Sequence, residues 1–279
     1  MDEIINRLAS RDNSVPGDYE KEGIRYCGKC HKPKQCWSDD CGWEGKRRLL
    51  TIGCDCEKTK VAREREESDL QQFMASVEAD QEKFRVTDNA YRSMTFEKDD
   101  RRDAAKSDTC LRYVEHWPEM RQNNMGILFY GSVGTGKTFY GCSIVNALLA
   151  KKVRVTVTNF PRLLNLLQSA KDRQEFIDHL QCYDLLVIDD LGVERNSSFA
   201  EEQVFNVIDA RARSGLPLIV TTNMTLDELK NPASMQYARI YDRVLELCPI
   251  TIKMTGDSRR AGNAQRRLEL ARQLLSGKD

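Results

Sequence analysis

Short apolar runs alternate with amphipathic stretches along the second half of the chain, from Thr109 onward. Runs of four to eight apolar residues are typical of strands buried on both faces. Longer stretches with apolar residues every three or four positions are typical of helices. Strands and helices in alternation predict an α/β fold, with a parallel sheet covered by helices on its two faces.

The expected strands lie at 126–130, 153–160, 185–188, 218–222 and 250–254. Helices are expected at 110–117, directly after Thr138, from Pro161, from Ser198 to Ser214, at 225–231, at 237–248 and over an arginine-rich C-terminal stretch. Ser198 and Glu201 form a capping box, and Gly215 followed by Pro217 ends the helix that this box opens.

The first hundred residues have a different pattern. Residues 1–26 predict a short amphipathic helix, carrying Ile4, Ile5 and Leu8, followed by a polar loop. Of the 51 residues from Glu57 to Ser107, 24 are charged, and the few apolar ones recur at helical spacing (Leu70, Phe73, Met74, Val77). This predicts a long, solvent-exposed helical linker. The more apolar segment 84–96 is the expected start of the second domain.

Composition narrows the possible classes of protein. The 279 residues carry no formal net charge, so contact with nucleic acid or a membrane would need a local patch. No apolar run approaches membrane-spanning length and no secretory signal is recognisable, so we expect a cytoplasmic protein. Ten cysteines in such a chain indicate metal ligation rather than disulfides.

Six of the ten cysteines lie between residues 27 and 56. Cys27 and Cys30 form a C-x-x-C pair, which aims two thiolates at one tetrahedral ion, and Cys54 and Cys56 form a second, less usual C-x-C pair. We assign these four to a structural zinc ion, whose binding would supply on the order of 10 kcal/mol to so small a module. Cys36, Cys41 and His31 are the substitutes if the C-x-C pair does not bind.

Residues 131–138 match G-x-x-x-x-G-K-[ST], between a predicted strand and a predicted helix. Backbone N–H groups of such a loop surround phosphate oxygens at a helix N-terminus. Lys137 would reach the outer phosphates, and the Thr138 hydroxyl would bind Mg²⁺. The alternative is a glycine-rich turn that binds nothing. The residues expected to hold ATP are Gly131, Ser132, Val133, Gly134, Thr135, Gly136, Lys137 and Thr138.

Polar residues follow two other predicted strands. Parallel sheets bind ligands at the carboxyl ends of their strands. Asp189 ends the 185–188 strand and is expected to hold Mg²⁺, while Asp190 would orient or deprotonate the attacking water. Asn223 ends the 218–222 strand and would contact the water or the γ-phosphate. An ordinary strand-to-loop turn is the alternative for each.

The segments GILFYGSVGTGKT, LLVIDDLG and LIVTTN, in this order, resemble the AAA+ ATPases of the DnaC/DnaI helicase-loader and IstB transposition-helper group, over residues 84–262. The resemblance implies a sensor-1 role for Asn223 and little or no lid domain. An arginine finger would fall on Arg243, or else on Arg239. Sensor 2 would fall on Arg260 or its neighbour Arg259. Asp190 stands where many AAA+ proteins have glutamate, and Glu194 is a candidate to share its task.

The same resemblance implies an ATPase that loads a replicative helicase onto single-stranded DNA and self-associates through its ATPase domain. We expect a zinc-binding, partner-docking module at 1–60, a linker at 61–100 and the AAA+ domain at 101–279. The alternatives are a transposition-helper ATPase, a small-molecule kinase, or an ATP-binding adaptor with little hydrolysis. The last helix has arginines that would contact DNA phosphates or simply face solvent (Arg259, Arg260, Arg266, Arg267, Arg272).

Overall fold

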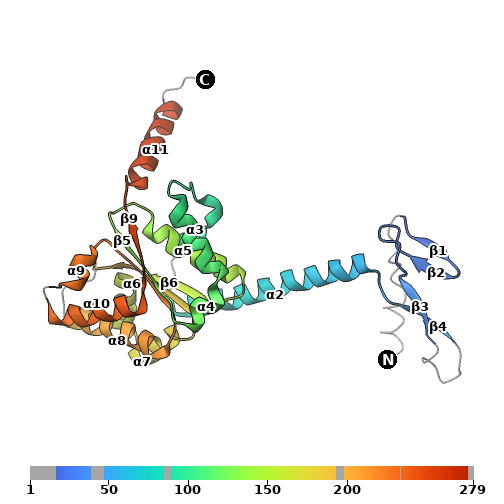
Figure 1. Cartoon of the computed structure of the whole chain (residues 1–279), viewed down its shortest axis with the longest axis horizontal. Coiled ribbons are helices and arrows are strands. Elements are labelled where there is room, and N and C mark those ends of the chain that lie inside the picture. Colours follow the sequence, from blue (N-terminus) through green and yellow to red (C-terminus); the bar gives the residue numbers. More distant parts are fainter. Residues whose placement is uncertain (1–16, 39–46, 85–88, 193–197, 233, 276–279) are drawn as a thin grey trace. The chain divides into compact units, whose positions relative to one another are not determined.

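The computed structural model describes residues 17–38, 47–84, 89–192, 198–232 and 234–275 (Figure 1). Contacts between residues divide the chain into two units, Met1–Gln72 and Phe73–Asp279. The dividing point lies inside the segment predicted as a linker. Ile4, Ile5, Leu8, Cys41 and Glu194 lie outside the described residues.

The first unit contains two small antiparallel ribbons, β1–β2 and β3–β4. β1 and β2 occupy a segment that we predicted as a polar loop, so that prediction was wrong. Each is only three residues long and rich in charged side chains, which leaves no alternation of apolar and polar positions to detect. The strands are β1 (Tyr19–Lys21), β2 (Ile24–Tyr26), β3 (Gln35–Ser38) and β4 (Arg48–Thr51).

The helix α2 (Asp55–Phe84) occupies the first part of the predicted linker. Most of its side chains are exposed, as expected of a charged spacer, but Val77 and Gln81 are buried near its end. The Gln81 side-chain amide donates to the backbone carbonyl of Val155 at 3.0 Å. Asp80 accepts from the hydroxyl of Tyr183 at 3.0 Å. The end of α2 is therefore a packed part of the second unit.

The second unit is built on five parallel strands in the order β6-β7-β8-β5-β9. This confirms the predicted parallel sheet. Its central strands are apolar runs that are largely buried on both faces of the sheet. The strands are β5 (Ile127–Gly131), β6 (Val155–Asn159), β7 (Leu185–Leu191), β8 (Leu218–Thr222) and β9 (Ile250–Met254).

Helices cover both faces of this sheet (Figure 1). One apolar cluster joins Leu128, Ile188 and Val220 to α6, α7, α8 and α10. The other joins Phe129, Val187 and Ile219 to α3, α4 and α5. Alternate residues of one strand thus belong to opposite cores, as the two-residue period of a strand requires. α7 was not predicted from the sequence.

The helices of this unit are short to medium in length. They are α3 (Ala104–Glu115), α4 (Trp117–Gln122), α5 (Lys137–Ala150), α6 (Phe160–Ser169), α7 (Arg173–Leu180), α8 (Ser198–Ser214), α9 (Leu226–Lys230), α10 (Met235–Leu247) and α11 (Arg259–Leu275), with 3₁₀ turns η1 (Asn89–Ser93) and η2 (Phe96–Lys98). Over the described part of the chain, none of the helices has the length and apolar character needed to cross a membrane.

The buried side chain of Arg211, on α8, ties the amino ends of two strands together. Its guanidinium donates to the carbonyl oxygens of Pro217 at 2.8 Å, Tyr183 at 2.9 Å and Asp184 at 3.0 Å. Buried charge is tolerated only when its donors are satisfied, and here several carbonyls satisfy them. This arrangement fixes the starts of β7 and β8. Their opposite, carboxyl ends meet beside the end of β5.

Candidate nucleotide-binding site

The loop between β5 and α5 requires glycine at its turning points. Gly131, Gly134 and Gly136 have φ angles of 122°, 80° and 103°, in the region that favours glycine. A Cβ atom on Gly131 would lie 2.3 Å from the carbonyl oxygen of Met254, and one on Gly134 would lie 2.1 Å from the Ser258 hydroxyl oxygen. Gly136 precedes the first residue of α5 and offers no side-chain cap. The N–H groups of the first helical turn are therefore available to an anion.

Lys137 is the first residue of α5 and is 5% exposed. Its Nζ donates to the carbonyl oxygens of Gly131 at 2.8 Å and of Ser132 at 2.7 Å. The ammonium group is thus held against the loop that the glycines shape. This places a positive charge beside the N–H groups, where phosphate oxygens would be stabilised.

Thr138 and Asp189 meet beneath the loop, although 51 residues separate them. The Thr138 hydroxyl is 2.8 Å and 3.0 Å from the two carboxylate oxygens, and the Thr221 hydroxyl also donates to this carboxylate. Burial raises the pKa of Asp189, and the neighbouring Asp190 carboxylate adds to that effect. A buried carboxylate beside a hydroxyl is a donor set that fits Mg²⁺, because a cation would offset the cost of burying the charge.

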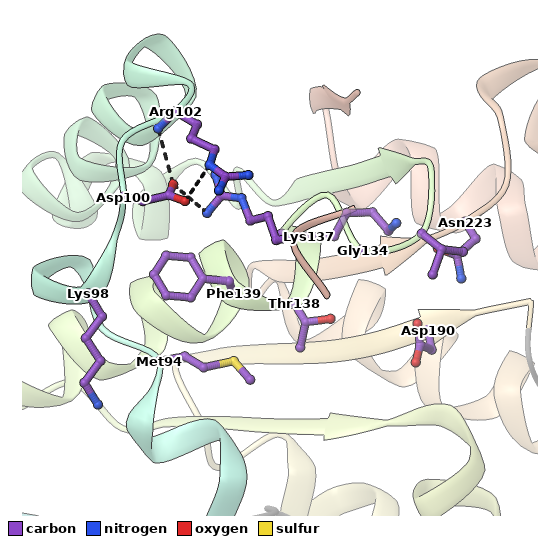
Figure 2. Close-up of a pocket in the computed structure, with 13 residues that line it drawn as sticks. Met94, Lys98, Asp100, Arg102, Gly134, Lys137, Thr138, Phe139, Asp190 and Asn223 are labelled. Atoms are coloured by element: carbon purple, nitrogen blue, oxygen red, sulfur yellow. Dashed lines mark hydrogen bonds and ion pairs between the residues drawn. The ribbon is translucent and has the colours of Figure 1, made fainter. Parts of the chain in front are cut away.

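Asp190 adopts a left-handed backbone conformation, with φ 61°. A register shift between Ile188 and Leu191, where β7 pairs with β8, accompanies it. The backbone N–H of Asp190 donates to the Thr221 hydroxyl at 3.0 Å. This irregularity separates the two acids: Asp189 faces Thr138 under the loop. Asp190 instead lines the open cavity, as Figure 2 shows.

The cavity above the loop has a volume of about 540 Å³, within the range of small-molecule sites. Lys137, Thr138, Asp190 and Asn223 line it together, as Figure 2 shows. The structure therefore gathers the predicted loop, acid and amide residues at one place. Sequence reasoning did not identify the opposite wall, which comes from Met94, Lys98, Asp100, Arg102 and Phe139.

The predicted arginines fall in different places. Arg259 lines the cavity, whereas the side chain of Arg260 lies outside the described residues. Arg243 and Arg239 are on α10 and do not line the cavity. Arg243 instead pairs with Glu246 at 2.6 Å, and the Arg239 side chain is exposed.

A second cluster lies in the first unit, where Cys27, Cys30, Cys54 and Cys56 come together. Their sulfur atoms all lie within 4.8 Å of one another. Four thiolates around one ion at ~2.3 Å are about 3.8 Å apart, so this donor set fits a tetrahedral zinc ion. Of the three substitutes, Cys36 lies on β3 and His31 packs against Tyr19, so neither belongs to the cluster, and Cys41 lies outside the described residues.

Buried ion pairs support the cysteine cluster from outside. Lys34 is 4% exposed and pairs with Asp18 at 2.8 Å and Glu57 at 2.6 Å. Glu57 also accepts from the backbone N–H of Cys54 at 3.2 Å, and Asp18 accepts from that of Gly28 at 3.1 Å. One lysine thereby links the segments that carry the two cysteine pairs.

Comparison with known proteins identifies a family of ATP-binding proteins that this chain matches. The model of the IstB-like ATP binding protein family matches residues 57–267, well over half of the chain. Replicative helicase loader DnaI of Bacillus subtilis is 28% identical over 148 residues, covering 48% of this chain and 47% of that protein. Replicative helicase loader DnaC of Escherichia coli K12 is 27% identical over 138 residues, covering 48% and 54%. The chain thus spans about half the length of these curated relatives.

Solved structures share the fold. The crystal structure of DnaI is similar with a TM-score of 0.52 and 23% identity, covering 62% of this chain and 94% of that one. A putative primosome component from Streptococcus pyogenes serotype M3 is similar with a TM-score of 0.51 and 26% identity, covering 61% and 90%.

Proposed function

The chain belongs to the IstB-like ATP-binding family, and from this premise we propose that it is an ATP-dependent loader of a replicative helicase. It would place that helicase on single-stranded DNA in the cytoplasm when replication begins. The observation that carries the proposal is the gathering of Lys137, Thr138, Asp189, Asp190 and Asn223 at the carboxyl edge of the sheet. Relatives named as replicative helicase loaders support the choice of client.

Each residue of the site has a distinct task in this proposal. The loop N–H groups and Lys137 bind the phosphates, and Thr138 with Asp189 would hold Mg²⁺. Bound Mg²⁺ would neutralise charge that develops on the phosphate oxygens. Asp190 orients the attacking water and accepts its proton, and Asn223 fixes that water from the next strand. Arg259, one of the two sensor-2 candidates, lines the same cavity.

The α10 arginines support self-association as part of the proposal. A cation that does not reach its own cavity can complete the site of a neighbouring copy, and head-to-tail contacts of this kind build rings or open spirals. Arg243 remains the first candidate for this finger and Arg239 the second. The Arg243 pair with Glu246 is on the surface, so it would cost little to break when a neighbour binds.

The first unit would dock the helicase. Apolar side chains are exposed on its second ribbon, where Trp37 is 49% and Leu49 is 37% exposed. These two residues are direct cross-strand partners and so lie on one face of the ribbon. Exposed apolar side chains gathered on one face are typical of a protein-binding surface. A zinc ion on the four cysteines would keep this small unit folded.

The proposal is tested by co-purifying the full chain with the replicative helicase of its host, with ATP, with ADP and without nucleotide. We expect capture that depends on ATP and is lost in Lys137→Ala. A Trp37→Ala variant should no longer capture the helicase but should still bind ATP. Equal capture in all nucleotide states would contradict the loader.

The family match itself favours one other function, a transposition-helper ATPase, because the matching model carries the IstB name. A helper of this kind would act with a transposase instead of a helicase. ATP-dependent capture of a transposase without any helicase capture would favour that function.

A further inference from the structure

An almost fully enclosed carboxylate lies beside the nucleotide cavity, in the segment that precedes α3. Asp99 follows η2, and its side chain is 1% exposed. It accepts from the Tyr140 hydroxyl at 3.2 and 3.4 Å and from the backbone N–H of Arg101 at 3.1 Å. A buried carboxylate requires such partners. A further partner is the guanidinium of Arg259, whose Nη1 is 3.7 Å away.

Arg259 lies directly on the phosphate loop. Its backbone N–H donates to the Gly134 carbonyl oxygen at 2.9 Å. A Cβ atom on Gly136 would be 3.6 Å from its Cζ, which places the guanidinium against the loop backbone. The Cζ also lies 5.9 Å from the centroid of the Tyr140 ring. Tyr140 therefore contacts the guanidinium with its ring and Asp99 with its hydroxyl.

We propose that Asp99 is a positioning residue for Arg259. Together with Tyr140, it holds the guanidinium at the mouth of the phosphate loop, so that the outer phosphates of ATP meet a cation that is already oriented. This inference rests on the proposed role of Arg259 as the sensor-2 residue. It adds an acid and a tyrosine to the residues that the family resemblance implies.

The energetic reason is the entropy of a long side chain. A free arginine side chain loses rotamer entropy when it is immobilised, and an arginine held in place before binding has less to lose. Burial raises the pKa of Tyr140 to about 12, with Asp99 contributing, so the hydroxyl stays protonated and donates. Asp100 also contacts Arg259, at 3.1 Å, but it is 42% exposed and is shared with Arg102 at 3.0 Å. An exposed, shared carboxylate orients the guanidinium less strongly.

The position of Arg259 extends the consequence beyond the cavity, because Arg259 is the first residue of α11. Asp99 precedes α3, and Tyr140 lies on α5. The three residues thus connect three elements at the site of the phosphates. A nucleotide that binds Arg259 would therefore affect the positions of α11, α5 and the segment before α3 together.

The test compares nucleotide affinities of full-length variants, using fluorescent ATP and ADP analogues. Asp99→Asn keeps the shape and removes the charge, and we expect it to raise the Kd for ATP about 3- to 10-fold, and that for ADP less. Tyr140→Phe removes only the hydroxyl and should shift the Kd for ATP in the same direction by a smaller factor. Asp108→Asn is the matched control, because Asp108 pairs with Arg101 at 2.6 Å and not with Arg259.

A double-mutant cycle separates positioning from a purely structural role. If Asp99 acts through Arg259, then Asp99→Asn has no further effect on the Kd in an Arg259→Ala background. An equal loss in both backgrounds would overturn the inference, as would an unchanged Kd for ATP in both Asp99→Asn and Tyr140→Phe. Wild-type protein that binds no ATP would overturn the nucleotide assignment itself, and this inference with it. If Asp99→Asn does not fold, Tyr140→Phe alone carries the same cycle.

Discussion

Burying the charged carboxylate of Asp189 lowers the stability of the fold, and in the proposed site a bound cation would offset this cost. Burial raises its pKa, so the folded state binds the carboxyl proton more tightly than the unfolded chain does. The free energy of unfolding therefore falls as the pH rises above the ordinary carboxyl value of 3.8. Residues poised in this way for function often reduce stability.

Asp189→Asn removes this charge and keeps an oxygen for Thr138 and Thr221. Without nucleotide at pH 7, we expect the variant to be more stable than the wild type. Its free energy of unfolding, measured by urea denaturation, should be about 0.5–2 kcal/mol higher. The advantage should shrink as the pH is lowered toward 4. A variant less stable than the wild type at pH 7 would contradict this account.

Thr221 supports both acids through one hydroxyl, which donates to Asp189 and accepts from the Asp190 N–H. Thr221→Val leaves the buried Asp189 carboxylate without one of its donors and the partly buried Asp190 N–H without its acceptor, so it should cost about 1–3 kcal/mol of stability. ATP hydrolysis should fall more than ATP binding, because Lys137 and the glycine loop are unchanged. Thr251→Val, at an exposed position of β9, is the control. Unaltered hydrolysis in Thr221→Val would exclude the supporting role.

Candidate site residues that lie in a motif can be predicted from the sequence. Those whose role depends on a contact with a residue distant in the sequence cannot. Lys137 and Asp189 were predictable because a fixed spacing or a strand end marks them. Thr221 was not, since it reads as one more buried position of an apolar strand. Asp99 and Tyr140 meet across 41 residues, and no local pattern records that contact.

At the scale of elements, Arg211 shows how one helix fixes the start of two strands. Arg211→Met leaves the carbonyls of Pro217, Tyr183 and Asp184 without donors, and we expect a loss of about 3–5 kcal/mol in the free energy of unfolding. Arg213→Met is the matched control on the same helix. Arg213 is 72% exposed and pairs with Asp209 at 3.2 Å, so its loss should cost under about 1 kcal/mol. Similar losses of stability in the two variants would contradict this role of Arg211.

The elements of the second unit were largely predictable, because their apolar runs are long. The five strands lie within a few residues of their predicted ranges, and α8 begins at Ser198, where the helix was predicted to begin. The short strands β1 and β2 were missed because backbone pairing and nearby buried ion pairs hold them, rather than an apolar face. Such support leaves no periodic trace in a sequence.

At the scale of the whole molecule, the two units have separate sources of stability. Metal chelation, or Cys54→Ser, should unfold the first unit and leave the second folded, since only the first lacks a large apolar core. We expect the near-UV circular dichroism signal of Trp37 to be lost, while the Kd for ATP stays within about twofold of that of the untreated wild type. Cys182→Ser, at an exposed cysteine outside the cluster, is the control. Loss of ATP binding on chelation would show that the units do not fold separately.

The central claim is that ATP bound at Lys137 drives the placing of a helicase on DNA. It is tested most directly by measuring how the host replicative helicase displaces an oligonucleotide annealed to a single-stranded DNA circle that is coated with single-stranded-DNA-binding protein. The wild-type chain with ATP should restore unwinding, whereas Lys137→Ala and Trp37→Ala should not. Unwinding restored equally by Lys137→Ala, or by no form of the chain, would contradict the account.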